Sequence, residues 1–464
     1  MRRSANMLSG PLWSSLITYT IPIILTSILQ LLFNAADLVI VGRYSGSINV
    51  AAVSATGSIT NLIVNLFIGL SIGAGVTVAH ALGGNNAQAA HRTVHTALPT
   101  AIVGGIVLSV VGVVFAKTFL TMMKTPVNVL HLSAKYMRIY FCGMTFTMVY
   151  NFCASILRAA GDTKSPLVFL TLAGIINVVL NIFFVVKLDM TVDGVALATV
   201  ISQAISSILV VLALMRRTDA CRLNLRKMRF YKIQFLKIIR IGLPAGIQSS
   251  MFAISNVIVQ SSINSFNSEA LMSGNGAAGN IEGFVFVIMN SFHQTAVNFI
   301  GQNMGAHQYK RIKKIFITCL IYVSVAGFIA GFSVWSFGKE LLGIYITDSQ
   351  EAIQYGLIRF NFIALPYFVC GLMDVSTGSL RGLGASFTPM CLSILGVCGI
   401  RILWIYTIFQ IPQYHIPECL YISYIISWLG TFIFQTTAFI IIYKKRILAD
   451  KNISRMPEFK GEVT

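Results

Sequence analysis

The chain has 464 residues, of which 56% are hydrophobic and only 11% are charged. Soluble globular domains carry about 25% charged residues, so this composition excludes a soluble protein and predicts an integral membrane protein. The formal net charge of +19 could point to nucleic acid, but in a membrane protein an excess of Lys and Arg mainly reports topology. We therefore expect no nucleic-acid partner.

Apolar stretches long enough to cross a bilayer recur along the whole chain, since a spanning helix needs about 20 residues. They are longer than the roughly ten-residue alternating strands of a membrane β-barrel, so helices are expected throughout. The predicted spans lie at residues 13–41, 51–82, 94–118, 130–157, 166–187, 193–215, 238–264, 275–302, 314–338, 354–378, 387–411 and 418–443. This pattern predicts an all-α membrane protein with twelve transmembrane helices, six in each half.

Landmarks of the first half recur in the second half at a constant spacing. Pro22 and Pro244 lie as far apart in the sequence as Gly83 and Gly305. An apolar chain built from two related halves is typical of transporters whose pathway runs between two bundles. We therefore expect two pseudo-symmetric six-helix lobes.

Lys and Arg collect in the loops on one side of the predicted membrane, and much of the acid lies in the alternate loops. Because cytoplasmic loops carry the excess of Lys and Arg, we expect a multi-pass protein of the cytoplasmic membrane with both termini in the cytoplasm. The predicted parts are an N-lobe at 1–215, a basic cytoplasmic linker at 216–237, a C-lobe at 238–445 and a polar cytoplasmic tail at 446–464.

A polar stripe runs along the first predicted span. Gln30, Asn34 and Asp37 follow helical spacing and share one face. An ionisable side chain inside a span is unfavourable unless it has a partner or a function. We interpret Asp37 as a coupling-ion or proton site, with a hydrogen-bond anchor between helices as the alternative.

Three further polar residues lie on the fifth and sixth spans. Asn177 and Asn181 are four residues apart and share a face, and Thr199 follows on the next span. Together with Asp37 they form a set of oxygen ligands that could hold Na⁺, while a partly desolvated Asp37 could carry a proton instead. The alternative is that the two asparagines only join helices, since spacing alone does not bring these spans together.

The second half contains different buried charges. Asp374 lies in the tenth span and Glu282 near the start of the eighth, and we expect both to face the substrate cavity or an ion. Asn256 of the seventh span, with Gln30 and Asn34, is assigned to the same cavity. A position of Glu282 near the membrane interface is the alternative.

Two further features bear on mechanism. Pro22 removes a backbone hydrogen bond within the first span and predicts a kink there, either static or movable. The sequence carries no Walker A, metalloprotease or nucleophile-elbow motif, and its histidines are scattered. We therefore expect no enzyme activity and no cofactor other than a coupling ion taken from a gradient, and the reading as a membrane-embedded enzyme is disfavoured.

Taken as a set, these motifs resemble the multidrug and toxic compound extrusion (MATE) family. The motifs that carry the resemblance are Asp37 after a proline-bearing first span, the turns at Leu82-Gly83 and Met304-Gly305, and the turns at Leu157-Arg158 and Leu380-Arg381. The resemblance covers nearly the whole chain. It implies an N-lobe and a C-lobe of six helices each and an alternating-access cycle.

The resemblance also implies roles for individual residues. The residues that match the family's N-lobe ion site are Asp37, Asn177, Asn181 and Thr199, with Tyr136 beside them. Pro22 matches the bending proline, and Asp374 matches a tenth-helix aspartate of the C-lobe. Some branches have a second aspartate where this chain has Asn181. The resemblance therefore leaves open whether the coupling ion is H⁺ or Na⁺. The seventh helix lacks the glutamate of one branch, so a C-lobe cation site of that kind is in doubt.

The function that the resemblance implies is antiport of H⁺ or Na⁺ against cationic amphiphilic organic compounds. The expected partners are small organic cations, the coupling ion and the lipid bilayer, and the expected state is a monomer. A flippase for lipid-linked oligosaccharides is the alternative. It should line its cavity with many cations, whereas the main basic residues inside spans here are Arg138, Arg359 and Arg401.

Overall fold

The structure, a computed structural model, describes residues 6–123, 125–347 and 349–453, and this part of the chain contains helices and no strands. The first half contains α1 (Leu12–Ser45), α2 (Ser47–Gly83), α3 (Ala87–Met122), α4 (Val127–Cys142), α5 (Met144–Ala159), α6 (Lys164–Ile182), the π-helix η1 (Phe183–Lys187) and α7 (Val192–Met215). A short 3-10 helix, η2 (Leu225–Lys227), lies in the linker.

The second half contains α8 (Lys232–Asn264), α9 (Glu269–Gly305), α10 (Tyr309–Ser336), α11 (Gly338–Tyr345), α12 (Gln350–Ile363), α13 (Tyr367–Gly382), α14 (Phe387–Ser393), η3 (Ile394–Gly399), α15 (Ile400–Tyr406), η4 (Ile408–Gln410), η5 (Pro412–Tyr414) and α16 (Pro417–Ile453). α16 runs beyond the expected lobe boundary at 445, so the first part of the expected tail is helical. Residues 454–464 of that tail lie outside the described residues.

The twelve predicted spans correspond to these helices. Within the described ranges, nine helices are long and apolar enough to cross a membrane, and two bent pairs add two more. The remaining span is α9, whose 37 residues are long enough but include many polar side chains. The chain is therefore an all-α, multi-pass membrane protein with the expected number of helices.

Two spans that we expected to be continuous are broken. The chain bends by 47° between α4 and α5 and by 51° between α12 and α13. The first bend lies at Gly143, where an added Cβ would come 2.6 Å from Val200, and the second lies just before Pro366-Tyr367, where proline removes a helical hydrogen bond. The breaks fall in the fourth and tenth spans, so the two halves share them.

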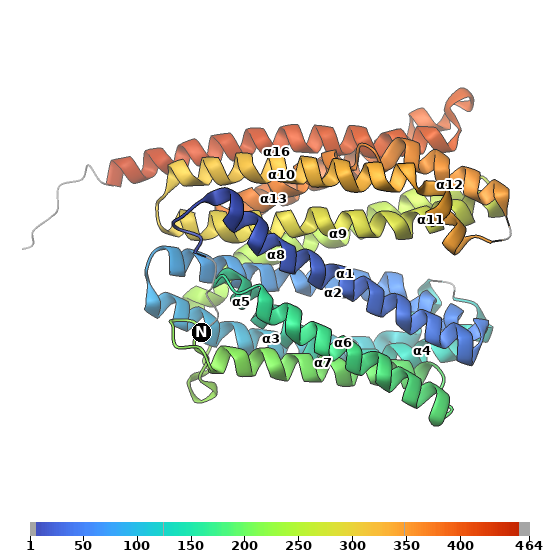
Figure 1. The fold of residues 1–464 in the computed structure, drawn as a ribbon, viewed down its shortest axis with the longest axis horizontal. Coiled ribbons are helices and arrows are strands. Elements are labelled where there is room, and N and C mark those ends of the chain that lie inside the picture. Colours follow the sequence, from blue (N-terminus) through green and yellow to red (C-terminus); the bar gives the residue numbers. More distant parts are fainter. Residues whose placement is uncertain (1–5, 124, 348, 454–464) are drawn as a thin grey trace, which may run out of the picture.

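The halves form two adjacent bundles, but α1 and α8 each cross from one to the other (Figure 1). Leu16, Tyr19 and Ile23 of α1 belong to the hydrophobic core of the C-lobe, although they precede the N-lobe helices in sequence. In return, Ile238 of α8 belongs to the N-lobe core. Pro22 lies where α1 leaves the C-lobe core for the N-lobe. The sequence boundaries of the lobes therefore do not describe these two helices.

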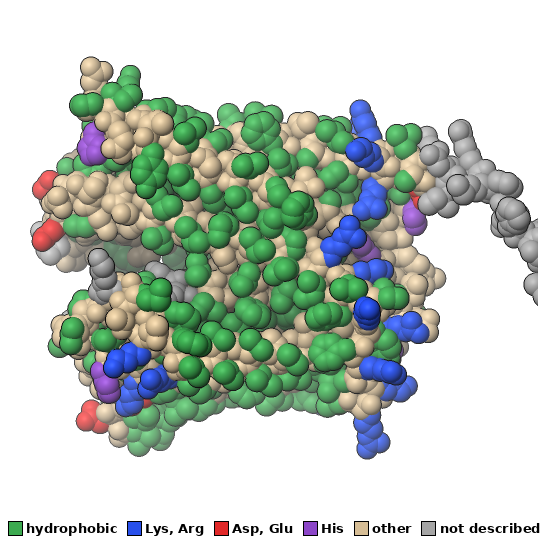
Figure 2. All heavy atoms as spheres, turned by 180° about the vertical axis from the view of Figure 1, so that it is seen from behind, with side chains coloured by type: hydrophobic (Ala, Val, Ile, Leu, Met, Phe, Trp, Pro, Cys, Tyr) green, Lys and Arg blue, Asp and Glu red, His purple; other side chains and the backbone are tan. Residues whose placement is uncertain are grey.

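Most of the Lys and Arg side chains visible in Figure 2 lie at one end of the molecule, which we call the basic end, and a smaller group lies at the opposite end. The basic end contains the α2–α3 and α9–α10 turns and the last turns of α16, which lie together at the left of Figure 1. At the opposite end the surface is hollowed between the two halves (Figure 2). We call this space the cleft.

The lobes touch closely at the basic end. An added Cβ on Gly83 would lie 1.8 Å from the carbonyl oxygen of Gln302, and one on Gly305 would lie 2.1 Å from the carbonyl oxygen of His80. The two glycines that mark the repeat in the sequence thus each allow the backbones of α2 and α9 to meet. This contact gives the repeated turns a structural reason.

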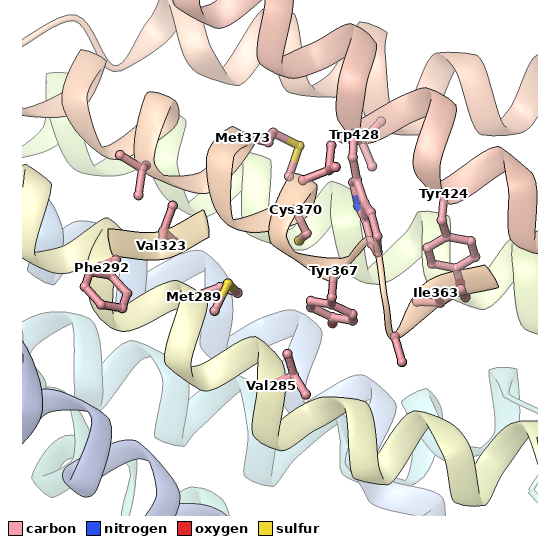
Figure 3. Close-up of a cluster of buried hydrophobic side chains, with 14 of the residues drawn as sticks. Val285, Met289, Phe292, Val323, Ile363, Tyr367, Cys370, Met373, Tyr424 and Trp428 are labelled. Carbon is pink, nitrogen blue, oxygen red and sulfur yellow. The ribbon is translucent and has the colours of Figure 1, made fainter. Parts of the chain in front are cut away.

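The helices are apolar outside as well as inside. Exposed side chains such as Val107, Val110 and Val114 of α3 form part of an outer hydrophobic belt, as expected for surfaces in contact with lipid. Inside the C-lobe, Val285 and Met289 of α9 pack with Tyr367 and Cys370 of α13 (Figure 3). The polar side chains described next are therefore exceptions in an apolar interior.

Candidate ion and cargo sites in the two lobes

Three helices of the N-lobe bring four predicted polar residues together. The Asn181 side chain on α6 donates from Nδ2 to Oδ1 of Asp37 on α1 at 2.5 Å. Thr199 on α7 donates from Oγ1 to the other carboxylate oxygen at 3.4 Å. Asn177 completes the group, since its Nδ2 donates to Thr199 Oγ1 at 3.5 Å and its Oδ1 accepts from Asn181 Nδ2 at 3.3 Å.

The approach of α1 to α6 depends on a glycine. A Cβ on Gly174 would lie 1.8 Å from the ring of Phe33, so only glycine leaves room for that ring against α6. Phe33 precedes Asp37 by four residues on α1, and Asn177 and Asn181 follow Gly174 on α6. The packing of Phe33 on Gly174 therefore brings the carboxylate within reach of the two amides.

The group contains an unsatisfied oxygen. Asn181 is fully buried, and its Oδ1 has no hydrogen-bond partner among the described residues. A buried acceptor without a partner destabilises the folded state by roughly 1–3 kcal/mol. Carboxylate, amide and hydroxyl oxygens are hard ligands suited to a cation such as Na⁺, and the free Oδ1 of Asn181 is one more oxygen of this kind. A proton on Asp37 is the other way to neutralise the carboxylate.

Tyr136 lies next to this group in an apolar wall. Its ring packs against the buried cluster that includes Ile40 and Val41 and stacks on Tyr140 with 6.1 Å between ring centroids. No hydrogen bond joins its hydroxyl to Asp37 in the described structure. Tyr136 therefore shields the site.

The remaining polar residues of α1 lead away from the site. Gln30 and Asn34 are exposed and Asp37 is half-buried. All three share a helix face, so the carboxylate is the least exposed member of the stripe. Pro22, where α1 passes from the C-lobe to the N-lobe, is buried, and its carbonyl oxygen accepts a hydrogen bond of 2.6 Å from Thr26.

In the C-lobe, Asp374 is buried on α13 beside a polar network. Its Oδ2 has no hydrogen-bond partner among the described residues. Its backbone carbonyl accepts from His293 Nδ1 at 2.8 Å, which leaves His293 Nε2 as the acceptor facing Arg381 Nη1 at 3.2 Å. Arg381 also donates to Gln248 Oε1 at 2.8 Å. A free carboxylate oxygen therefore lies near a buried guanidinium to which it is not hydrogen-bonded.

Glu282 differs from the cavity-facing carboxylate that we expected. It is 4% exposed and forms a two-point salt bridge with Arg359, with Oε1–Nε at 2.9 Å and Oε2–Nη2 at 2.6 Å. The third nitrogen of Arg359 donates to Asn275 Oδ1 at 2.6 Å. The pair joins α9 to α12 inside the lobe, so both oxygens of Glu282 are occupied.

Asn256, the other expected C-lobe cavity residue, is exposed on α8. Its Oδ1 accepts a hydrogen bond of 3.3 Å from Arg401 Nη1. It therefore connects the surface of the lobe to a buried cation.

The contacts that join the lobes were not foreseen from sequence. At the basic end His80 Nε2 lies 2.7 Å from the carbonyl oxygen of Gly382, and Gln302 Nε2 donates to the carbonyl oxygen of Ala159 at 2.6 Å. Arg158 hydrogen-bonds to Gln294 across the same interface. The repeated turns around Arg158 and His80 could have predicted these contacts between the lobes, because equivalent turns of two related halves meet at a pseudo-twofold axis.

The comparisons with known proteins agree with this architecture. The family model described as MatE matches residues 22–183 and 244–407. The chain belongs to the MatE family. The two matched segments begin at Pro22 and Pro244, so the model recognises both halves of the repeat.

Related proteins are similar over most of their length. The chain is 27% identical to a "Probable multidrug resistance protein YoeA" of Bacillus subtilis, covering 84% of this chain and 85% of that protein. It is 23% identical to an "FAD transporter" of Shewanella oneidensis (87% and 89% covered) and 19% identical to the "Multidrug export protein MepA" of Staphylococcus aureus (85% and 87% covered).

Solved MATE structures share the fold. A MATE protein in complex with MaL6 superposes with a TM-score of 0.88 at 18% identity, covering 97% of this chain and 100% of that chain. An outward-facing multidrug resistance MATE transporter gives 0.88 at 17% identity, with 97% and 99% covered. The two-lobed fold expected from the sequence is therefore confirmed, and the family is one of transporters.

Proposed function

We propose that the protein is a secondary active transporter that exports cationic, amphiphilic organic compounds in exchange for H⁺ or Na⁺. The observation that carries the proposal is the N-lobe group around Asp37. A carboxylate inside an apolar bundle, next to a buried amide oxygen without a partner, has the composition of a site that takes up and releases a small cation. No nucleotide-binding motif occurs in the sequence, so the energy source would be an ion gradient.

Alternating access has support in how the lobes meet. They are in contact at the basic end and separated by the cleft at the other end (Figure 2). By the distribution of Lys and Arg, the basic end would be cytoplasmic, with both termini on that side. The cleft would then open to the outside of the cytoplasmic membrane, and transport would require the contacts around Gly83 and Gly305 to separate.

α1 is the element that would couple the ion to this movement. It carries Asp37 in the N-lobe, Pro22 where it crosses, and Tyr19 in the C-lobe core. The Tyr19 hydroxyl also donates to the carbonyl oxygen of Arg158 at 2.8 Å. A change at the carboxylate could therefore reach the closed interface through one continuous helix.

The relatives bear on the cargo. YoeA and MepA are named for multidrug resistance and export, which matches the proposed cargo, whereas the Shewanella oneidensis relative is named for FAD. A lipid-linked oligosaccharide flippase is not favoured. One of the few buried cations that it would need, Arg359, is neutralised by Glu282.

The test uses everted membrane vesicles with a panel of cationic dyes. A pH gradient and a Na⁺ gradient are imposed separately, and dye uptake is followed by fluorescence. One of the two gradients should drive uptake in vesicles containing the protein and not in vesicles without it. If neither gradient moves any cation, the proposal is wrong.

A further inference from the structure

A buried guanidinium of the C-lobe is not neutralised by any carboxylate in the described residues. Arg401, on α15, is 3% exposed. It donates from Nε to Ser427 Oγ at 3.1 Å and from Nη1 to Asn256 Oδ1 at 3.3 Å, and both acceptors are uncharged. A buried charge without a counter-ion is strongly unfavourable inside a membrane protein and marks a functional site by default.

The aromatic side chains of α16 hold this guanidinium in place. Its Cζ lies 4.0 Å from the ring centroid of Tyr424 and 5.9 Å from that of Trp428. Both rings project from α16 into the core (Figure 3) and contact each other at 5.6 Å. Cation–π contacts stabilise the position of the guanidinium, but they leave its positive charge in place.

The neighbouring Glu282 is already paired with another cation, Arg359. Arg359 lies 5.9 Å from the same Tyr424 ring, and Glu282 pairs with it through both carboxylate oxygens. The cluster of Arg359, Arg401 and Glu282 therefore carries one excess positive charge. That charge resides on Arg401.

Asn256 links the buried Arg401 to the exposed polar face of α8. Asn256 and Gln260 are one turn apart and both exposed. Their side chains point into the lobe, because Asn256 accepts from Arg401 and Gln260 Oε1 accepts from Asn275 Nδ2 at 2.9 Å. α8 also borders the N-lobe, since the Ser250 hydroxyl donates to the carbonyl oxygen of Leu62 at 3.2 Å.

We propose that Arg401, with Asn256 and Gln260 at its entrance, is a subsite for a carboxylate of the transported molecule. The hydrogen bond from Arg401 to Asn256 is long, and its acceptor is neutral. A carboxylate that displaces the Asn256 amide oxygen therefore gains a charge-assisted hydrogen bond. Asp37, in the N-lobe, has the opposite sign. The cargo would thus include zwitterionic amphiphiles, with the cationic part attracted to the N-lobe and the carboxylate bound to the C-lobe.

This inference rests on the proposed export function, because the subsite is useful only if the cleft is the cargo pathway. The test therefore measures binding and transport separately. The probes are rhodamine B, which carries a free carboxylate and a cationic ring system, and its ethyl ester, which keeps the cation and loses the carboxylate. Binding to the purified full-length protein in detergent is measured by fluorescence anisotropy.

Wild-type protein should bind the free acid more tightly than the ester. Arg401→Gln should weaken binding of the acid by about tenfold to a hundredfold, the range expected for a lost hydrogen bond between charged groups, and leave ester binding unchanged. Arg401→Lys, which keeps the charge without the planar fork, should retain part of the preference. The control is Lys339→Gln, which removes an exposed cation of α11 and should change neither affinity.

An equal loss for acid and ester in Arg401→Gln would give Arg401 a structural role and overturn the subsite, as would no preference in the wild type. Ion-driven uptake of the ester without any preference for the acid would reject the subsite and leave the export function standing. Uptake of neither dye, with the acid preference present in purified protein, would reject the export function and retain the anion subsite.

Discussion

Asn181 hydrogen-bonds to Asp37 through its amide nitrogen, while its buried carbonyl oxygen has no partner in the described structure. The two residues come from helices that are separated by most of the N-lobe sequence. One side of the amide thus holds the carboxylate, and the other side offers an oxygen to a ligand. This relationship makes the N-lobe group a candidate for ion coupling.

We expect Asp37→Asn to abolish ion-driven dye uptake in everted vesicles. The substitution keeps the shape of the side chain and removes the only carboxylate of the group, so neither a proton nor Na⁺ can be bound by charge. Expression and detergent stability should stay close to wild type. Asp193→Asn, which alters an acid paired with the exposed Lys135 outside the group, should retain uptake. Retained coupled uptake in Asp37→Asn would contradict the assignment.

Asn181→Asp should strengthen binding of the coupling ion. A second carboxylate replaces a neutral amide next to Asp37, and affinity for a hard cation rises with the charge of its ligands. We expect the ion concentration that gives half-maximal uptake to fall about tenfold, measured by varying Na⁺ and H⁺ in turn. Asn34→Asp, on the exposed part of the same stripe, is the control and should have little effect. An unchanged ion requirement in Asn181→Asp would place the ion elsewhere.

Arg359→Met should destabilise the C-lobe strongly, because it leaves Glu282 buried without a counter-ion. Breaking one partner of a buried pair costs about 3–5 kcal/mol, which should appear as a marked fall in the Tm of the purified protein. The double variant Glu282→Gln/Arg359→Met removes both charges and should recover much of the loss. If the double variant is as unstable as the single one, packing and not charge explains the effect.

Gly83→Ala should impair transport by opening the basic end. The added methyl group would meet the carbonyl oxygen of Gln302 at 1.8 Å, and such overpacking costs about 1–3 kcal/mol. The equilibrium between the closed and open basic end should shift by about fivefold to 150-fold, since 1.4 kcal/mol corresponds to a factor of ten. Labelling of a cysteine introduced at Thr295, a buried residue of α9 whose hydroxyl lies 2.8 Å from that of Thr20 on α1, should become faster.

The matched control for this glycine is Gly283→Ala on α9. A Cβ there meets nothing within 4 Å, so uptake and labelling should match the wild type. If both alanine variants behave alike, the lobe contact at Gly83 does not limit transport.

The sequence by itself determined the broad architecture. Long apolar runs predict helices wherever the chain crosses a bilayer, and a repeat of prolines and glycines predicts two related lobes. Both signals are present in the linear sequence and need no knowledge of tertiary contacts. Asp37 could also be identified as a candidate site from the sequence, since a carboxylate within an apolar span is unfavourable unless it has a partner or a function. The repeated glycines were identified as landmarks, although their role in lobe contact was not.

Tertiary structure alone decided which of these polar residues meet. Asp37, Asn181 and Thr199 lie on three helices, and their convergence depends on the room that Gly174 leaves for Phe33. The pairing of Glu282 with Arg359, and the consequent excess charge on Arg401, depend in the same way on which faces of α9, α12, α15 and α16 pack together. Helix periodicity tells which residues share a face, but only the fit of side chains between helices selects the face that each one meets.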